Sequence, residues 1–193
     1  MRTPPPALAQ RLVSVSEQVL RPDQDLRLED VAALVDSKRA TLYYYFSGRE
    51  DLIAFLLTEH LAAAAHAIET ASAAHSSPAG RLRSAVAALV GFLGEKPGVC
   101  AGLLSFAGAA GRMASVLAAQ DSMVAEPIRN ILAAGPFDVD DPRDATNAML
   151  GAAMIATIDR WYRGKASTPA FQRRLTEQIV RGVLSDTGET VSN

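Results

Sequence analysis

Apolar residues recur at three- and four-residue spacing along the chain, whereas runs of β-branched residues alternating with polar ones are absent from the sequence. Alanine, leucine and arginine, which favour helices, are frequent throughout. The pattern therefore predicts an all-α fold. We expect an N-terminal three-helix helix-turn-helix domain over residues 1–48 and a C-terminal helical ligand-binding and dimerisation domain over residues 49–193.

The first 48 residues are predicted to form three helices. The first carries four apolar residues on one face, namely Leu8, Leu12, Val15 and Val19. The second covers about residues 28–35 and has acids in its first turn, and the third covers about residues 38–46. Two short helices joined by a tight turn are the layout of a helix-turn-helix, whose second helix reads the major groove of DNA.

Beyond residue 48 the same periodicity predicts longer helices. They run from residue 49 towards 70 and over about 81–94, 114–133, 143–163 and 169–184, with a break at 76–80 and a stretch rich in glycine and alanine at 99–111. Pro127 should kink or divide its helix, because proline lacks the backbone N–H that an interior helical position donates.

The charge of the chain does not by itself indicate a nucleic-acid partner. Among 193 residues the formal net charge is -2 and the sequence pI is about 5.9. Within residues 1–50, seven lysines and arginines are matched by seven aspartates and glutamates, so the formal difference is zero. If this domain binds DNA, the local placement of its cations must be responsible.

Composition also bears on location and class. Cys100 is the single cysteine, so no disulfide can form within the chain, and we expect a cytoplasmic protein. The N-terminus lacks the apolar core of a signal peptide, and we expect no membrane-spanning segment. His60, His66 and His75 lack the one-turn spacing of a helical zinc pair, and Cys100 has no evident histidine partner. We therefore expect no enzyme activity, no metal and no cofactor.

The third predicted helix has the outer face of a major-groove reader. Leu42 and Phe46 lie one turn apart and should pack inward. The side that faces away is small and polar, with Ala40, Thr41 and Tyr44 outward and Tyr43 at its flank. Lys38 and Arg39 occupy the first turn, where they can supply the local positive charge. The same aromatic run also fits a packed aromatic corner without any DNA.

Residues 31–53, which read VAALVDSKRATLYYYFSGREDLI, resemble the DNA-binding signature of the tetracycline-repressor (TetR) family. The most specific part is Thr41-Leu42-Tyr43 with Phe46 three residues on, followed by a basic residue and Leu52. The resemblance implies that Thr41, Tyr43 and Tyr45 contact phosphates or bases and that Tyr44 occupies a variable reading position. It also implies that Arg49, where the family usually has lysine, meets the DNA backbone.

Three further positions depart from the family pattern and bear on the DNA contacts. Asp36 stands where the family usually has a turn glycine, and aspartate tolerates a left-handed conformation at some cost. Lys38 stands where a serine usually begins the recognition helix, so Ser37 is expected to cap it instead. Arg27 occupies a place that is commonly threonine or serine, and we count it among the phosphate contacts.

The predicted helix over 143–163 is apolar nearly all round and should be covered on two faces. Gly151, Ala152 and Ala153 permit close approach of another helix, and the last helix adds an inward stripe at Phe171, Leu175, Ile179 and Val183. The family resemblance implies dimerisation here, so we expect a homodimer through about residues 143–184 and a palindromic operator. The alternative is a buried core within one monomer.

A ligand site is implied by the resemblance but has no motif of its own. Candidate apolar contacts are Phe92, Leu103, Phe106, Met113 and Met123, each of which ordinary helical core would also explain. Candidate polar contacts are His60, Asn147 and Tyr162.

The sequence as a whole predicts a ligand-responsive transcriptional regulator. We expect a repressor that binds double-stranded operator DNA as a dimer and is released by a small apolar or amphipathic effector. The alternative is an all-α ligand carrier or interaction scaffold that binds no DNA, which the balanced charge of residues 1–50 favours.

Overall fold

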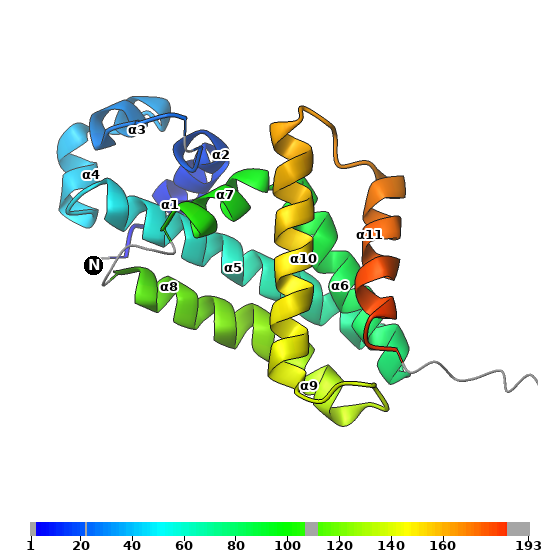
Figure 1. The fold of residues 1–193 in the computed structure, drawn as a ribbon. Coiled ribbons are helices and arrows are strands. Elements are labelled where there is room, and N and C mark those ends of the chain that lie inside the picture. Colours follow the sequence, from blue (N-terminus) through cyan, green and yellow to red (C-terminus); the bar gives the residue numbers. More distant parts are fainter. Residues whose placement is uncertain (1–2, 22, 107–111, 185–193) are drawn as a thin grey trace, which may run out of the picture.

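The computed structural model describes residues 3–21, 23–106 and 112–184, and within them the chain is helical, as the periodicity predicts (Figure 1). The N-terminal helices are α1 (Pro6–Ser14), α2 (Ser16–Val19), α3 (Leu28–Leu34) and α4 (Arg39–Tyr45). They are followed by α5 (Arg49–Ala73), α6 (Pro78–Glu95), α7 (Pro97–Phe106), α8 (Arg112–Gln120), the π-helical turn η1 (Asp121–Ala125), α9 (Glu126–Ala134), α10 (Pro142–Tyr162) and α11 (Pro169–Arg181).

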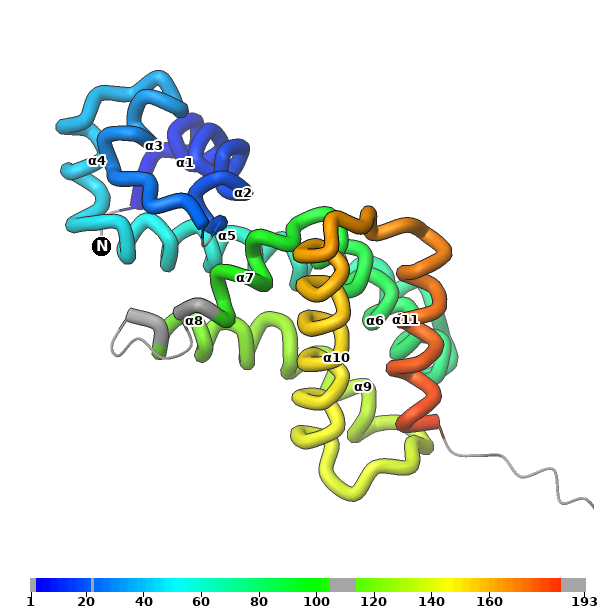
Figure 2. The backbone as a smooth tube through the Cα atoms, turned by 45° about the horizontal axis from the view of Figure 1, so that its top comes forward, coloured from blue at the N-terminus to red at the C-terminus, as the bar shows by residue number. Residues whose placement is uncertain are grey.

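The four N-terminal helices form a small bundle at one end of the molecule, and α10 and α11 lie at the other (Figure 2). The prediction of one continuous first helix is wrong. The chain leaves helical geometry at Val15, with φ -102° and ψ 4°, and this residue separates α1 from α2. Leu8, Leu12 and Val19 are nevertheless buried. The break lets α2 turn towards α7, which it contacts.

Helix α5 joins the two ends and is the central element of the core. It packs against α1 on one side and against α6, α7 and α8 on the others. Contrary to the sequence-based expectation, α5 is long and apolar enough to pass for a membrane span, and so are α6 and α7 together if their sharp bend is ignored. The burial of α5 against its neighbours accounts for its composition, since core helices are apolar on most faces.

Helices α8 and α9 run on through the π-helical turn η1, which ends immediately before the helix that contains Pro127. Proline cannot donate the backbone hydrogen bond of a regular turn, and the wider π turn accommodates that loss. The predicted disturbance at Pro127 is therefore present, but it takes the form of a widened turn and leaves no gap in the helical stretch.

Helix α10 is covered on one face only. Met149, Leu150, Ala153 and Thr157 are buried within the monomer, whereas Ile155 is 56% exposed. Ala153, which the sequence suggests for contact with another helix, faces the core of its own chain with 0% exposure. On α11 the inward stripe is confirmed, since Leu175, Ile179 and Val183 are buried and Phe171 packs against the core.

Candidate DNA-binding surface

Helices α3 and α4 cross and are held by apolar side chains from both, as the sequence predicts. Leu28, Val31 and Ala32 bury the inner face of α3. Leu42 and Phe46 are both 0% exposed, and the Phe46 ring lies 5.5 Å from the ring of Phe55 on α5. The core contacts of α4 thereby fix which of its faces points outward.

The turn between α3 and α4 depends on a left-handed residue. Asp36 has φ 45°, the conformation for which glycine is best suited. The backbone N–H of Ser37 donates to the carbonyl of Ala32 at 2.9 Å, and Arg11 donates to the carbonyl of Asp36 at 3.3 Å. Aspartate thus takes the glycine position, with its backbone anchored from α1.

The start of α4 differs from the capping that the sequence suggests. Lys38 is the N-cap residue, with φ -73° and ψ 140°, and no side chain caps the helix. The expectation that Ser37 caps α4 is therefore wrong. The long, charged side chain of Lys38 stands exposed at this corner.

The outward face of α4 carries most of the predicted contact residues. Tyr43 and Tyr44 are 44% and 57% exposed, Arg39 is exposed, and Thr41 is half-buried. Tyr45 is also half-buried and packs against the core, with its ring edge-on to Tyr44 at 5.0 Å. Tyr45 is therefore placed to support Tyr44 more than to reach outward.

A glutamate on α3 binds two of these residues. Glu29 Oε1 lies 2.8 Å from Nη2 of Arg39 and accepts a hydrogen bond from the Tyr43 hydroxyl at 3.1 Å. The Arg39 guanidinium also lies over the Tyr43 ring, 5.2 Å from its centroid. The backbone N–H of Glu29 itself, Tyr43 and the two nearby arginines hold the pKa of the Glu29 carboxyl below its ordinary value. The sequence places Glu29 only among the acids of the first turn of α3, because nothing in the sequence pairs it with residues 10 and 14 positions away.

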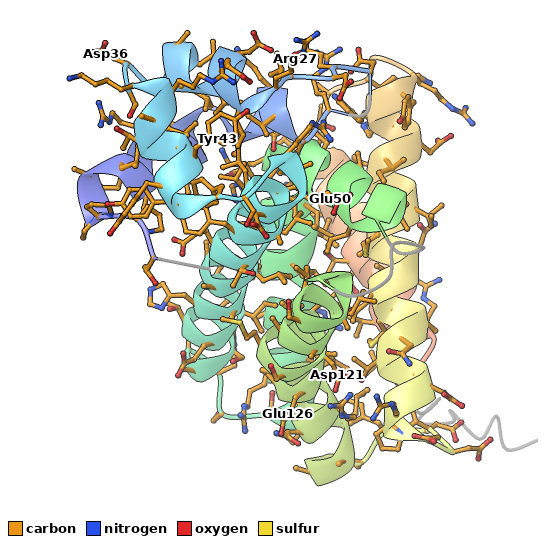
Figure 3. The ribbon with its side chains drawn as sticks, turned by 90° about the vertical axis from the view of Figure 1, so that its left-hand side faces the viewer. Arg27, Asp36, Tyr43, Glu50, Asp121 and Glu126 are labelled. Atoms are coloured by element: carbon orange, nitrogen blue, oxygen red, sulfur yellow. The ribbon has the colours of Figure 1, made fainter. Side chains whose placement is uncertain are left out.

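The two remaining predicted contacts lie at the edges of this surface. Arg27 is exposed at the start of α3, on the same end of the molecule as Tyr43 and Asp36 (Figure 3). Arg49 points elsewhere: its guanidinium donates to the carbonyl of Gln24 at 3.1 Å and approaches Asp25 at 3.7 Å, and its side chain is 27% exposed. Arg49 thus fastens the start of α5 to the segment before α3.

His60, which the sequence suggests as a ligand contact, lies at the seam between α2 and α5. Its Nε2 is 2.7 Å from Ser16 Oγ, and both residues are buried. Since the Ser16 hydroxyl donates to the carbonyl of Val13 at 2.7 Å, it accepts from His60, so Nε2 of the histidine carries a hydrogen. Burial, and secondarily the charge of Lys96, lower the pKa of His60 to about 4.

A second contact at the seam joins α2 to α7. Glu17 accepts a hydrogen bond from the backbone N–H of Gly98 at 3.1 Å, and a Cβ at Gly98 would lie in tight contact with this carboxylate, 3.0 Å from Oε2. Burial raises the pKa of Glu17, against the opposing effects of the Gly98 hydrogen bond and Lys96. The N-terminal bundle is therefore bonded to the first turn of α7 as well as to α5.

Behind the seam lies a narrow apolar cavity of about 20 Å³ between α5, α6, α7, α8, η1 and α10. Phe92 and Leu103, two of the predicted ligand contacts, line it, with Gln120 as its polar lining residue. His60, Met123, Asn147 and Tyr162 do not line it, and Asn147 and Tyr162 are exposed on α10. The side chains of Phe106 and Met113 lie outside the part of the chain that the structure describes. Of the six candidates whose side chains the structure describes, it therefore brings two, Phe92 and Leu103, together at this cavity.

Comparison with known proteins shows which solved structures share this arrangement of helices. No protein-family model and no curated protein matches the sequence. A tetR-family regulatory protein from Rhodococcus superposes with a TM-score of 0.76 at 19% identity, over 94% of this chain and 98% of that one. The fatty acid degradation regulator FadR from Bacillus halodurans gives 0.74 at 15% identity, over 90% and 98%. A protein named superantigen PfiT gives 0.71 at 17% identity, over 95% and 100%.

These superpositions extend over nearly the whole of each chain, so they include both the α3–α4 unit and the helices behind it. They confirm the resemblance seen in residues 31–53 at the level of fold. The chain has the fold of TetR-family transcriptional regulators.

Proposed function

We propose that this chain is a cytoplasmic transcriptional regulator that binds operator DNA through the outer face of α4. The observation that carries the proposal is the α4 surface itself. Two buried residues, Leu42 and Phe46, lock the helix, and two exposed tyrosines stand on its opposite face. An aromatic and hydroxyl-bearing face of this size suits the major groove, where side chains meet base edges and phosphates.

Local charge supports the same proposal. Lys38 and Arg27 are exposed on this end of the molecule, and no ion pair involves either of them within the described residues. Phosphate contacts supply most of the affinity of such proteins, so these two residues are the first candidates. Because Arg49 is engaged by backbone carbonyls within its own chain, we assign it to positioning α5 and leave it out of the contacts.

We further propose that α10 forms the centre of a two-fold dimer. Its open face presents small and apolar residues at helical spacing, namely Ala148, Gly151, Ala152, Ile155 and Tyr162. A side chain at Gly151 would meet nothing within 4 Å in the monomer, so a partner helix can approach closely at that point. Two reading heads related by a two-fold axis would favour a palindromic operator.

Regulation by a small molecule is the third part of the proposal. The cavity behind the seam is lined almost wholly by apolar side chains, which suits an apolar or amphipathic effector. Two of the similar structures are described as regulators of fatty acid metabolism or degradation. An effector that expands this cavity would displace α7, which Glu17 joins to the N-terminal bundle. Release of DNA, and hence relief of repression, would follow from such a movement.

DNA binding is tested by selecting duplexes from a random pool with the purified protein and measuring binding by fluorescence anisotropy at several salt concentrations. We expect a salt-sensitive complex that weakens on Lys38→Ala and Tyr44→Ala. Glu69→Gln, a substitution at an exposed site far along α5, is the control and should bind as the wild type does. Absence of any complex at low salt would contradict the proposal.

Two observations favour a second function. The fold is shared with a protein named as a superantigen, and the charge of residues 1–50 is balanced. A helical ligand carrier or interaction scaffold would therefore use the same architecture without DNA. Failure of the duplex selection, with the protein folded, would favour that role.

A further inference from the structure

Glu29 is an acid in contact with two side chains of the surface proposed to meet DNA, where a phosphate-binding protein gains nothing from negative charge. It is the second residue of α3, and both of its partners belong to α4. Arg39 and Tyr43 lie one helical turn apart and converge on the same atom, Glu29 Oε1, at 2.8 Å and 3.1 Å. The three side chains form one cluster that spans the helix-turn-helix.

The cluster restricts Arg39 more than an ordinary surface ion pair would. Its guanidinium is held at one side by the carboxylate and lies over the Tyr43 ring at 5.2 Å. Exposed ion pairs are weak singly, so the charge of Glu29 adds little to the stability of the fold. What the cluster does fix is the direction in which Arg39 and Tyr43 point and the amount of free positive charge on the surface.

We propose that Glu29 is a specificity-determining residue of the DNA-binding surface, which orients Arg39 and Tyr43 and withholds Arg39 from phosphates of unrelated sequences. Non-specific binding consists almost entirely of phosphate contacts, so it loses the contribution of Arg39 while the ion pair persists. An operator can compensate with base contacts made by the oriented side chains. The acid therefore lowers affinity for unrelated DNA more than affinity for the operator. This inference rests on the proposed DNA-binding function.

The test compares the wild type with Glu29→Gln, which keeps the size of the side chain and removes its charge. Each protein is titrated with the selected operator and with a scrambled duplex over a range of salt. For Glu29→Gln we expect several-fold tighter binding to the scrambled duplex and a smaller ratio of operator to scrambled affinity. The log–log salt slope should steepen by about 0.9, the value for one added phosphate contact.

Two further variants separate release of Arg39 from a general change in charge. Glu69→Gln makes the same change in charge at a distant, exposed position on α5 and should leave slope and ratio unchanged. In an Arg39→Gln background, Glu29→Gln should no longer steepen the slope, because the cation that it would free is absent. A steeper slope in that background would overturn the proposal.

The outcomes also separate this inference from the proposed function. If the wild type selects no sequence and forms no salt-sensitive complex, DNA binding itself fails. If the wild type binds its operator but Glu29→Gln has the same slope and the same ratio, DNA binding stands and the assignment of Glu29 is overturned.

Discussion

The Nε2 atom of His60 lies 2.7 Å from the Oγ atom of Ser16, and this contact joins the central helix to the N-terminal bundle. Both side chains are almost completely buried, with 2% and 1% exposure. A protonated imidazole here would carry its charge in a desolvated site near Lys96. The seam between the two parts of the molecule therefore requires a neutral histidine.

Stability should fall on mild acidification because of His60. Its pKa is about 4 in the folded chain against 6.5 in the unfolded chain, so only the unfolded state takes up the proton between these values. The contribution is complete above pH 6.5 and is lost as the pH falls towards 4, with an expected size of about 3 kcal/mol.

Urea unfolding of the wild type and of His60→Gln from pH 7.5 to 4.5 measures this effect. The pKa of Glu17 is raised by burial, so Glu17 has the opposite effect on stability. Its protonation on acidification removes the cost of a buried charge and favours the folded state. The difference between the two proteins isolates the histidine. A difference that does not change with pH would refute the assignment.

Truncation of the α4 core should destabilise the fold. Leu42 is 0% exposed, and Leu42→Ala is expected to cost about 2–5 kcal/mol, measured by urea unfolding. Leu34→Ala is the matched control, since Leu34 is 45% exposed on α3 and its loss should change stability by less than about 0.5 kcal/mol. Equal effects at the two sites would show that α4 does not pack as described.

The left-handed turn residue offers a stabilising substitution. Asp36 has φ 45°, and Asp36→Gly should raise the free energy of unfolding by about 0.5–1 kcal/mol because glycine adopts this conformation without a steric cost. The bond from Arg11 involves the backbone carbonyl and is retained. Asp36→Ala, which keeps a Cβ and loses the polar group, should be less stable than either. A lower melting temperature for Asp36→Gly than for the wild type would contradict the assigned conformation.

The open face of α10 is tested by placing a charge on it. Ile155 is 56% exposed in the monomer, so Ile155→Arg should leave the fold intact and convert the proposed dimer to monomer, as measured by light scattering after size-exclusion chromatography. Leu117→Arg on α8 is the control, at a residue of 40% exposure outside α10. Dimers that persist in Ile155→Arg would argue against this interface.

The helices and the inward residues of α4 could be predicted because they depend on local periodicity. Leu42 and Phe46 recur at one helical turn, whereas the glycine-like role of Asp36 follows from the family resemblance. The break at Val15 could not be predicted, because the apolar pattern continues through it and only contact between α2 and α7 reveals the bend.

Side-chain partners far apart in sequence were beyond prediction for the same reason. Glu29 and Arg39 meet only because α3 and α4 cross, and Ser16 and His60 are separated by 44 positions. Arg49 has the charge expected of a phosphate contact, but its guanidinium donates to the carbonyls of Val19 and Gln24. Spacing indicates which residues share a helix face; it does not indicate which helix they will meet.

The cavity behind the seam has a consequence for how tightly an effector would bind. At about 20 Å³ it is far smaller than the several hundred cubic ångströms that a drug-sized ligand occupies, so the closed form described here cannot be the form that receives one. The measured dissociation constant would then equal the intrinsic constant divided by the fraction of molecules that are open. A substitution that hollows the wall, such as Phe92→Ala, would strengthen effector binding while weakening the fold, and the ratio of the two affinities would report how rarely the wild-type cavity opens.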